Sequence, residues 1–234
     1  VEGSRDAQDR DLVEAGLGSM PGGGAEVFSQ RVRDLVCRGK DTAEEWLEVH
    51  RRAHEVGIKT NCTMLYGHVE TLEERIDHLV RLRELQDESL ATAQRWRDTG
   101  ELPAINTTGE VGAFQCFIPL AFHPENTVFA RRGWSFTTGT DDLRMVAVSR
   151  LMLDNIPNIK AYWIMISPEV AQVALHHGAN DVDGTVMVER IVHMAGAKTQ
   201  QETQQETLVQ LIRGAGRIPV ERDTVYNELR RWEL

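Results

Sequence analysis

Compact apolar runs alternate along the chain with stretches that place apolar residues on one face of a helix. The runs at residues 16–20, 58–66, 114–122, 159–166 and 180–184 predict strands. The amphipathic stretches at residues 6–15, 25–36, 42–57, 71–88, 141–155 and 168–177 predict helices. Strands that alternate with helices of this length indicate βα units and a parallel sheet.

Capping residues mark two helix starts. Asp41 or Thr42 can cap the helix that stops at Gly57, and Thr71 begins the long helix that follows. Glutamates follow both caps in the first turn, where the helix dipole favours negative charge. Residues 88–111 are polar, and we interpret them as an extended helix end followed by a surface insertion at about 89–111.

The fold class that these elements predict is α/β, a partial (βα) TIM-type barrel. Five βα steps are counted where a closed barrel needs eight, so the chain corresponds to roughly the last five strands. We expect residues 1–198 to form this part of a barrel and residues 199–234 a C-terminal helical extension packing on it. An exposed strand edge is then expected, and a noncatalytic half-barrel that binds a partner at this edge is one alternative.

Composition indicates a globular protein, with 41% hydrophobic and 26% charged residues among 234. The net charge of −10 works against attraction to phosphate backbones, so nucleic acid is not expected as a partner. No apolar run approaches the roughly 20 residues of a membrane span, and we expect a cytoplasmic protein with no membrane partner. The odd number of cysteines, Cys37, Cys62 and Cys116, fits reduced thiols.

Polar and titratable residues gather where the predicted strands end. His68 and Glu70 follow one strand, and His123, Glu125 and Asn126 follow the next. Functional groups collect at the carboxyl ends of parallel strands because these ends open onto the ligand crevice. A histidine at such a position can donate or relay protons. The alternative interpretation is that these are loop residues that only cap the next helix. Asp181 and Asp183 end the last strand and are a weaker signal, because turns of this composition are common.

Glycines 22–24 form a loop between a strand and a helix, where backbone amides can approach a carboxylate or phosphate. The Gly-Lys-Ser/Thr of a nucleotide loop is missing, and a plain structural turn explains the glycines equally well. His50 and His54 have a zinc-compatible spacing, but Arg51 stands where a zinc protease needs Glu, and no metal site is expected.

Together these segments resemble the radical S-adenosylmethionine enzymes of futalosine-dependent menaquinone synthesis, and within them the aminofutalosine synthases. The match is carried by residues 16–26 (GLGSMPGGGAE), 60–70 (TNCTMLYGHVE) and 117–126 (FIPLAFHPEN), and is extended by residues 159–163 and 183–186. It covers nearly the whole chain apart from about 89–111.

The resemblance implies S-adenosylmethionine and a 4Fe-4S cluster as cofactors. It implies cofactor contacts for Ser19, Asn61, Gly67 and Glu70. Substrate contacts are expected at Gly23, Glu26, His68, His123, Glu125, Asn126 and Asp183, with His68 and His123 as catalytic candidates. The implied reaction adds a 5′-deoxyadenosyl radical to the enolpyruvyl double bond of 3-[(1-carboxyvinyl)oxy]benzoate and yields aminodeoxyfutalosine, with an electron donor such as flavodoxin or ferredoxin.

One feature departs from the family: the cluster-binding CxxxCxxC is absent from the 234 residues. We expect that motif upstream of Val1, and we expect this chain alone to be inactive because no cluster means no radical. The alternatives within the class are a dehypoxanthine futalosine cyclase, in which glutamine replaces His123, and a deazaflavin-forming synthase. A metal-dependent barrel hydrolase is a third alternative, with His68, His123 and Asp183 as its ligands.

Overall fold

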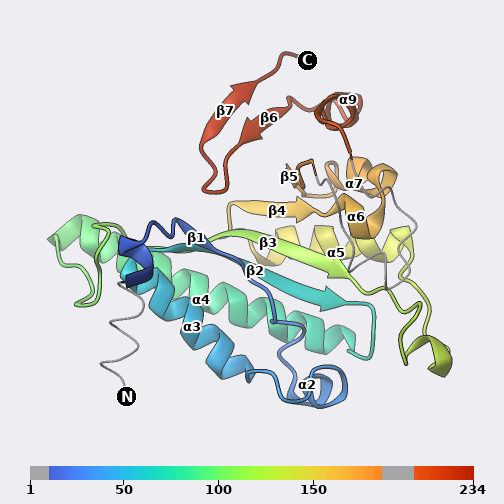
Figure 1. The fold of residues 1–234 in the computed structure, drawn as a ribbon, viewed down its shortest axis with the longest axis horizontal. Helices are drawn as coiled ribbons and strands as arrows, with labels where there is room; N and C mark the ends of the chain where they lie inside the picture. Colours follow the sequence, from blue (N-terminus) through green and yellow to red (C-terminus); the bar gives the residue numbers. More distant parts are fainter. Residues whose placement is uncertain (1–10, 186–202) are drawn as a thin grey trace.

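A computed structural model describes residues 11–185 and 203–234. Its centre is a five-stranded parallel sheet in the order β1-β2-β3-β4-β5 (Figure 1). The strands are β1 (Ser19–Met20), β2 (Lys59–Tyr66), β3 (Phe114–Ala121), β4 (Asn158–Ala161) and β5 (Asp181–Val182). The five predicted strands and their parallel pairing are confirmed, and within the described residues β1 and β5 form the two open edges of the sheet.

Two capped helices cover one face of β2 and β3. Helix α3 (Ala43–Val56) starts at a capping box made by Thr42 and Glu45, and α4 (Leu72–Thr99) starts at one made by Thr71 and Glu74. Helix α3 ends at Gly57, which has a left-handed φ of 109°. Helix α4 continues to Thr99, so the first part of the polar region 89–111 is helical, and the chain then crosses to β3 without regular structure.

The core lies between the sheet and helices α3, α4 and α5 (Gly139–Met152). Leu79 and Leu82 on α4, Met64 on β2 and Phe117 on β3 are fully buried in one apolar cluster. Each such side chain contributes about 1.5–3 kcal/mol when it is removed from water. Figure 1 shows α3 and α4 on one side of the sheet, which leaves its other side for the C-terminal elements.

Strand β3 contains a β-bulge near its start. Thr60 pairs with Phe114, but the next residue, Asn61, pairs with Cys116, so Gln115 is an extra residue. The Gln115 side chain donates to the carbonyl oxygen of Thr224, 3.1 Å away. The bulge therefore lies where the C-terminal segment contacts the sheet.

Two predicted boundaries are wrong. Helix α2 spans Gln30–Val36 and does not begin at residue 25, because the backbone before it bonds elsewhere: Leu65 donates to the carbonyl of Glu26 and Phe28 donates to His78. The strand predicted over 159–166 ends at Ala161, and its second half forms the short helix α6 (Trp163–Ile166) before α7 (Pro168–Ala174). A short, fully buried apolar run has no periodicity that separates strand from helix.

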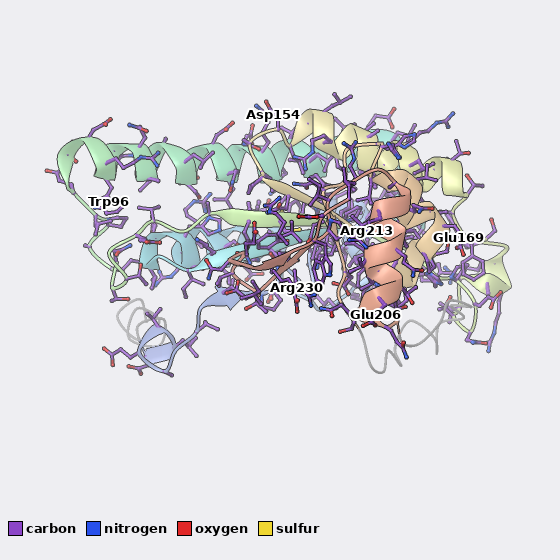
Figure 2. All side chains as sticks on the ribbon, turned by 90° about the horizontal axis from the view of Figure 1, so that it is seen from above. Trp96, Asp154, Glu169, Glu206, Arg213 and Arg230 are labelled. Atoms are coloured by element: carbon purple, nitrogen blue, oxygen red, sulfur yellow. The ribbon has the colours of Figure 1, made fainter. Side chains whose placement is uncertain are left out.

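The C-terminal segment was predicted as helical, and it contains one helix, α9 (Gln205–Gly214), followed by an antiparallel pair, β6 (Val220–Arg222) and β7 (Glu228–Arg231). Figure 1 shows both above β4 and β5, away from α3 and α4, with α9 beside α7. Arg213, labelled on α9 in Figure 2, donates to the carbonyl oxygen of Glu233 at 2.9 Å and joins the helix to the chain after β7. In the described part of the chain, no helix combines the length and apolar character needed to cross a membrane.

Candidate functional site

The carboxyl ends of β2 and β3 lie side by side. The amide of Phe122, just after β3, donates to the carbonyl oxygen of Tyr66 at the end of β2, at 2.8 Å. The rings of His68 and Phe122 meet edge to face with centroids 5.6 Å apart. The structure therefore brings together the two strand-end segments that the sequence singled out, and we refer to this region, residues 66–70 and 121–126, as the strand mouth.

Glu70 is the centre of the turn after β2. Its fully buried carboxylate accepts the amides of Gly67 (2.5 Å) and His68 (2.9 Å) and pairs with Arg75 at 2.7 Å. Gly67 has φ +91°, and a Cβ there would overlap the Thr137 side chain, so only glycine fits. The Glu70 carboxylate thus faces the interior of the turn and fixes the backbone of residues 67–69.

His68 belongs to the same buried turn. Its Nδ1 accepts the amide of Val69 at 2.7 Å, and Nε2 lies 2.8 Å from the carbonyl oxygen of Leu65, so the neutral ring protonated at Nε2 satisfies both contacts. Burial lowers the pKa of His68, although the Glu70 carboxylate 3.0 Å away acts in the opposite direction. His68 is a neutral imidazole that holds the turn.

His123 is buried at the end of β3, with Nε2 3.0 Å from the carbonyl oxygen of Met165 and its ring against Phe136 at 5.1 Å. Glu125 and Asn126 follow in the same loop, and Asn126 is exposed with a left-handed φ of 60°. These three residues therefore lie at the strand mouth beside His68 and Glu70.

The glycine loop continues from β1 along β2. Thr63 donates to the carbonyl of Gly22 at 2.6 Å, and Trp46 donates to that of Gly23 at 3.1 Å. A Cβ on Gly22 would overlap the backbone of Asn61, whereas the space around Gly23 is open. Glu26 pairs with Lys40 at 2.7 Å. The carbonyl oxygens of the loop thus hold it against both β2 and α3.

Ser19 and Asn61 lie on β1 and β2, near that loop. Ser19 pairs with Lys59 in the parallel ladder, two residues before Asn61. The Asn61 side chain is on the side of β2 opposite the buried Thr60 and Cys62, and its Oδ1 is buried without a hydrogen-bond partner in the described structure. A buried, unpaired acceptor of this kind is costly unless a ligand or water donates to it.

Asp183 lies apart from these residues, beyond β5. Lys160 on β4 donates to its carboxylate at 2.8 Å and lies 3.6 Å from Asp181. Asp181 in turn accepts Arg222 at 2.7 Å and the Tyr226 hydroxyl at 2.9 Å, both from the C-terminal pair. Asp183 also lines a cavity of about 990 Å³ between β5, α9 and the β6-β7 pair. It is therefore in a separate charged cluster that joins the C-terminal elements to the sheet.

Sequence reasoning missed the buried pair formed by Tyr66 and Asp142. The Tyr66 hydroxyl donates to Asp142 on α5 at 2.7 Å, and burial raises the pKa of Asp142. Tyr66 closes β2, so its place at a strand end was visible, but nothing in the sequence indicated its partner 76 residues later.

The cysteines are buried and apart from the strand mouth. The Cys62 thiol donates to the carbonyl of Cys116 at 3.6 Å. Burial raises the pKa of Cys62 well above its usual value, and burial next to Asp181 raises that of Cys116 to about 12. Metal clusters need thiolates, so these thiols are unsuited to that role. In residues 11–185 and 203–234, no three His, Cys, Asp or Glu side chains form a metal-binding group, so the hydrolase alternative has no ligand set there.

Comparison with known proteins places these features in a family. The model of the CofH/MqnC C-terminal region matches residues 111–233, more than half of the chain. The chain belongs to the CofH/MqnC family. The model of the radical SAM superfamily matches residues 4–82, which contain the glycine loop and the turn after β2.

The curated relatives of this CofH/MqnC-family chain include aminodeoxyfutalosine synthases and 4-hydroxyphenyl transferases. Aminodeoxyfutalosine synthase of Thermus thermophilus is 54% identical over 224 residues, covering 95% of this chain and 54% of that protein. The enzyme of the same name from Streptomyces coelicolor is 42% identical over 234 residues, with 95% and 54% coverage. A 5-amino-6-(D-ribitylamino)uracil–L-tyrosine 4-hydroxyphenyl transferase of Methanosarcina barkeri is 40% identical, with 94% and 54% coverage. The chain spans about half the length of these relatives, and the resemblance drawn from its sequence is confirmed.

Proposed function

We propose that this chain supplies the strand mouth of a radical S-adenosylmethionine enzyme that makes aminodeoxyfutalosine from 3-[(1-carboxyvinyl)oxy]benzoate. The observation that carries the proposal is the 54% identity with the Thermus aminodeoxyfutalosine synthase across 95% of this chain. The transferase relatives are less similar, at 38–41% identity. The second candidate function is the 4-hydroxyphenyl transfer that their name describes.

The residues near the glycine loop fit a polar cofactor. Asn61 carries a buried acceptor without a protein partner in the described structure, and Gly22 packs so closely on Asn61 that a side chain there is excluded. We assign Ser19 and Asn61 to direct contact with S-adenosylmethionine, and Gly67 to contact through its backbone. When bound, this cofactor supplies the 5′-deoxyadenosyl group that adds to the enolpyruvyl double bond. Glu70 then acts through Gly67, because its carboxylate holds the turn.

The three cysteines do not fit the 4Fe-4S cluster that the superfamily implies, because each is buried and the pKa values of the Cys62 and Cys116 thiols are raised. No step is assigned to the cluster from these residues. Alone, the chain is expected to give no 5′-deoxyadenosine. A one-electron donor such as flavodoxin or ferredoxin is part of the same proposal.

The proposed substrate carries two carboxylates and a benzene ring. His123, Glu125 and Asn126 lie at the strand mouth where such a molecule would meet the cofactor, and His123 is the residue we expect to orient it. Gly23 and Glu26 belong to the glycine loop, which packs along β2. Asp183 lies farther from the strand mouth, beside β5. The geometry therefore favours His123 over Asp183 as a substrate contact.

A hybrid enzyme tests the proposal. This chain replaces the matching part of the Thermus aminodeoxyfutalosine synthase, and the reconstituted hybrid is assayed without oxygen. Release of 5′-deoxyadenosine reports that the hybrid folds and cleaves the cofactor. We expect aminodeoxyfutalosine from the enolpyruvyl benzoate and no product from L-tyrosine with 5-amino-6-(D-ribitylamino)uracil. Cofactor cleavage with product only from the second pair would establish the transferase function instead.

A further inference from the structure

We propose that residues 122–138, between β3 and α5, form a recognition loop for an aryl carboxylate, with Trp134 and Phe136 contacting the ring and Arg131 and Arg132 the carboxylate. The assignment rests on the proposed function for the identity of the substrate. Both ends of the loop are fixed at the strand mouth, and its middle presents exposed aromatic and cationic side chains.

The first end of the loop is fixed to the strand mouth. The Phe122 amide donates to Tyr66 at the end of β2, and His123 bonds the carbonyl oxygen of Met165 on α6 at 3.0 Å. Phe122 also packs edge to face against His68 on one side and Phe129 on the other, with centroids 5.6 and 5.5 Å away. The loop therefore leaves β3 in contact with the turn that holds Gly67.

The second end returns to the same turn. Thr137 packs so closely on Gly67 that a Cβ at Gly67 would overlap its methyl group. Thr138 then caps α5 through a capping box with Asp141, and Asp142 accepts the Tyr66 hydroxyl at 2.7 Å. Both ends of the loop thus contact the end of β2 and the turn after it, which contains Gly67, one of the proposed cofactor residues.

The middle of the loop presents aromatic side chains to solvent. Trp134 and Phe136 are each 37% exposed and Val128 is 58% exposed. Phe129 packs edge to face on Trp134 with a centroid distance of 6.5 Å, and this contact helps to fix the position of the indole. Large aromatic side chains bring substantial contact area at low entropy cost, and a group of them exposed beside a strand mouth suits a planar ring.

The cations of the loop directly precede these aromatic residues in the chain. Arg131 and Arg132 belong to the single turn η1 (Ala130–Arg132) and are exposed. In the part of the chain that the structure describes, no ion pair or hydrogen bond is formed by either guanidinium. A guanidinium binds a carboxylate through two parallel hydrogen bonds and also stacks on aromatic faces. Rings and guanidinium groups on one anchored loop recognise a benzoate-type ligand better than an aliphatic acid.

Titration calorimetry of this chain tests the assignment, with circular dichroism to verify folding. The probes are 3-[(1-carboxyvinyl)oxy]benzoate, benzoate and cyclohexanecarboxylate. We expect both benzoates to bind and cyclohexanecarboxylate to bind at least tenfold more weakly. Trp134→Ala and the pair R131Q/R132Q should each weaken benzoate binding about tenfold, while Trp134→Phe should retain binding within about threefold because it keeps a ring.

Two surface substitutions serve as matched controls. Arg144→Gln and Leu151→Ala change side chains on α5 that are 76% and 79% exposed, and benzoate binding should be unchanged. The loop assignment is overturned if neither benzoate binds, if the loop variants bind as the unmodified chain does, or if the aliphatic acid binds equally well. If benzoate binds through Trp134 but the enolpyruvyl ether is excluded, the loop assignment stands and the proposed substrate is wrong.

Discussion

The hydroxyl of Tyr66 donates to the carboxylate of Asp142 across 2.7 Å, and this bond joins the end of β2 to the first turn of α5. Both side chains are buried, so the bond is shielded from water. It connects the end of β2, where the turn at Gly67 begins, to the start of α5, where the recognition loop ends. The geometry of the strand mouth therefore depends on a buried bond between one of its own residues and α5.

Removing this bond should loosen the mouth without unfolding the chain. Tyr66→Phe leaves the Asp142 carboxylate with one fewer donor in a buried environment, and we expect a loss of about 1–2 kcal/mol in the free energy of unfolding. Urea denaturation measures the loss. In the double variant Tyr66→Phe/Asp142→Asn the two effects should not add, because both changes remove the same interaction. Full additivity would show that the two residues are energetically independent.

The glycine loop offers two neighbouring substitutions with opposite outcomes. Gly22→Ala places a methyl group against the backbone of Asn61, which cannot move without disturbing the β2 ladder, and we expect a loss of more than about 2 kcal/mol. Gly23→Ala meets open space and should be neutral or stabilising by up to about 1 kcal/mol, because alanine restricts the unfolded chain. Thermal unfolding of the two variants compares them directly. Equal melting temperatures would mean that the loop does not pack on Asn61.

Glu70 provides a test of the turn. Glu70→Gln places an amide NH₂ where the carboxylate now accepts two backbone amides and an arginine, and we expect a loss of about 2–4 kcal/mol. The neighbouring Glu73→Gln changes an exposed side chain in the first turn of α4 and should have little effect. Hydrogen exchange of the Gly67 and His68 amides gives the local readout. Unchanged protection of these amides in Glu70→Gln would contradict the assigned role.

A directed chain of hydrogen bonds runs beneath the start of β2. Ser89 donates to the carbonyl of Leu85, so its oxygen accepts from Nδ1 of His54 at 2.7 Å. Nε2 of His54 is then an acceptor, and the Thr60 hydroxyl donates a hydrogen bond to it at 2.8 Å. The Thr60 oxygen in turn accepts from Nδ1 of His50 at 2.9 Å. Each ring is neutral in this arrangement, and burial lowers the pKa of both His50 and His54 to about 3.

Mildly acidic pH should therefore lower the free energy of unfolding. Burial also lowers the pKa of His78 to about 3, while an unfolded histidine titrates near 6.5. Between these values the unfolded chain binds more protons, so the stabilisation is complete above pH 6.5 and is lost as the pH falls towards 3. At pH 5 each of the three histidines should cost about 2 kcal/mol relative to pH 7.

Urea denaturation at pH 7 and pH 5 measures this loss. The surface variant His177→Asn, as a control, should keep the same difference between the two pH values. A free energy of unfolding at pH 5 within about 1 kcal/mol of that at pH 7 would show that the buried histidines do not govern acid stability.

Much of the fold was visible in the sequence because its signals are local. Thr42 and Thr71, each followed by glutamates, marked the starts of α3 and α4 correctly, since capping depends on residues within one turn. The β6-β7 pair was missed, because its strands are short and polar and are held by distant partners such as Asp181. Helix α2 was begun too early for the same reason: the backbone of residues 26–28 bonds to β2 and α4.

In the candidate site, too, local sequence signals were informative and the effects of distant contacts were not. Strand-end position correctly brought His68, Glu70 and His123 into one region, because parallel strands end at a common edge. Their chemical state could not be predicted. Burial and backbone partners make His68 a neutral part of the turn, and these are set by contacts such as Phe122 and Arg75 that no spacing rule indicates.

The extra residue in β3 interrupts the regular alternation of side chains between the two faces of the sheet. Phe114 packs on His54 under the sheet, and Phe117 is buried on that same face although the two are three residues apart, while Cys116 lies near Asp181 on the opposite face. Deleting Gln115 would restore regular alternation and leave Phe114, Cys116 and Phe117 on their present faces, because Gln115 is the residue without a pairing partner on β2. The strand thus keeps its register with β2 and still presents one spare side chain to the C-terminal segment, through the bond from Gln115 to Thr224.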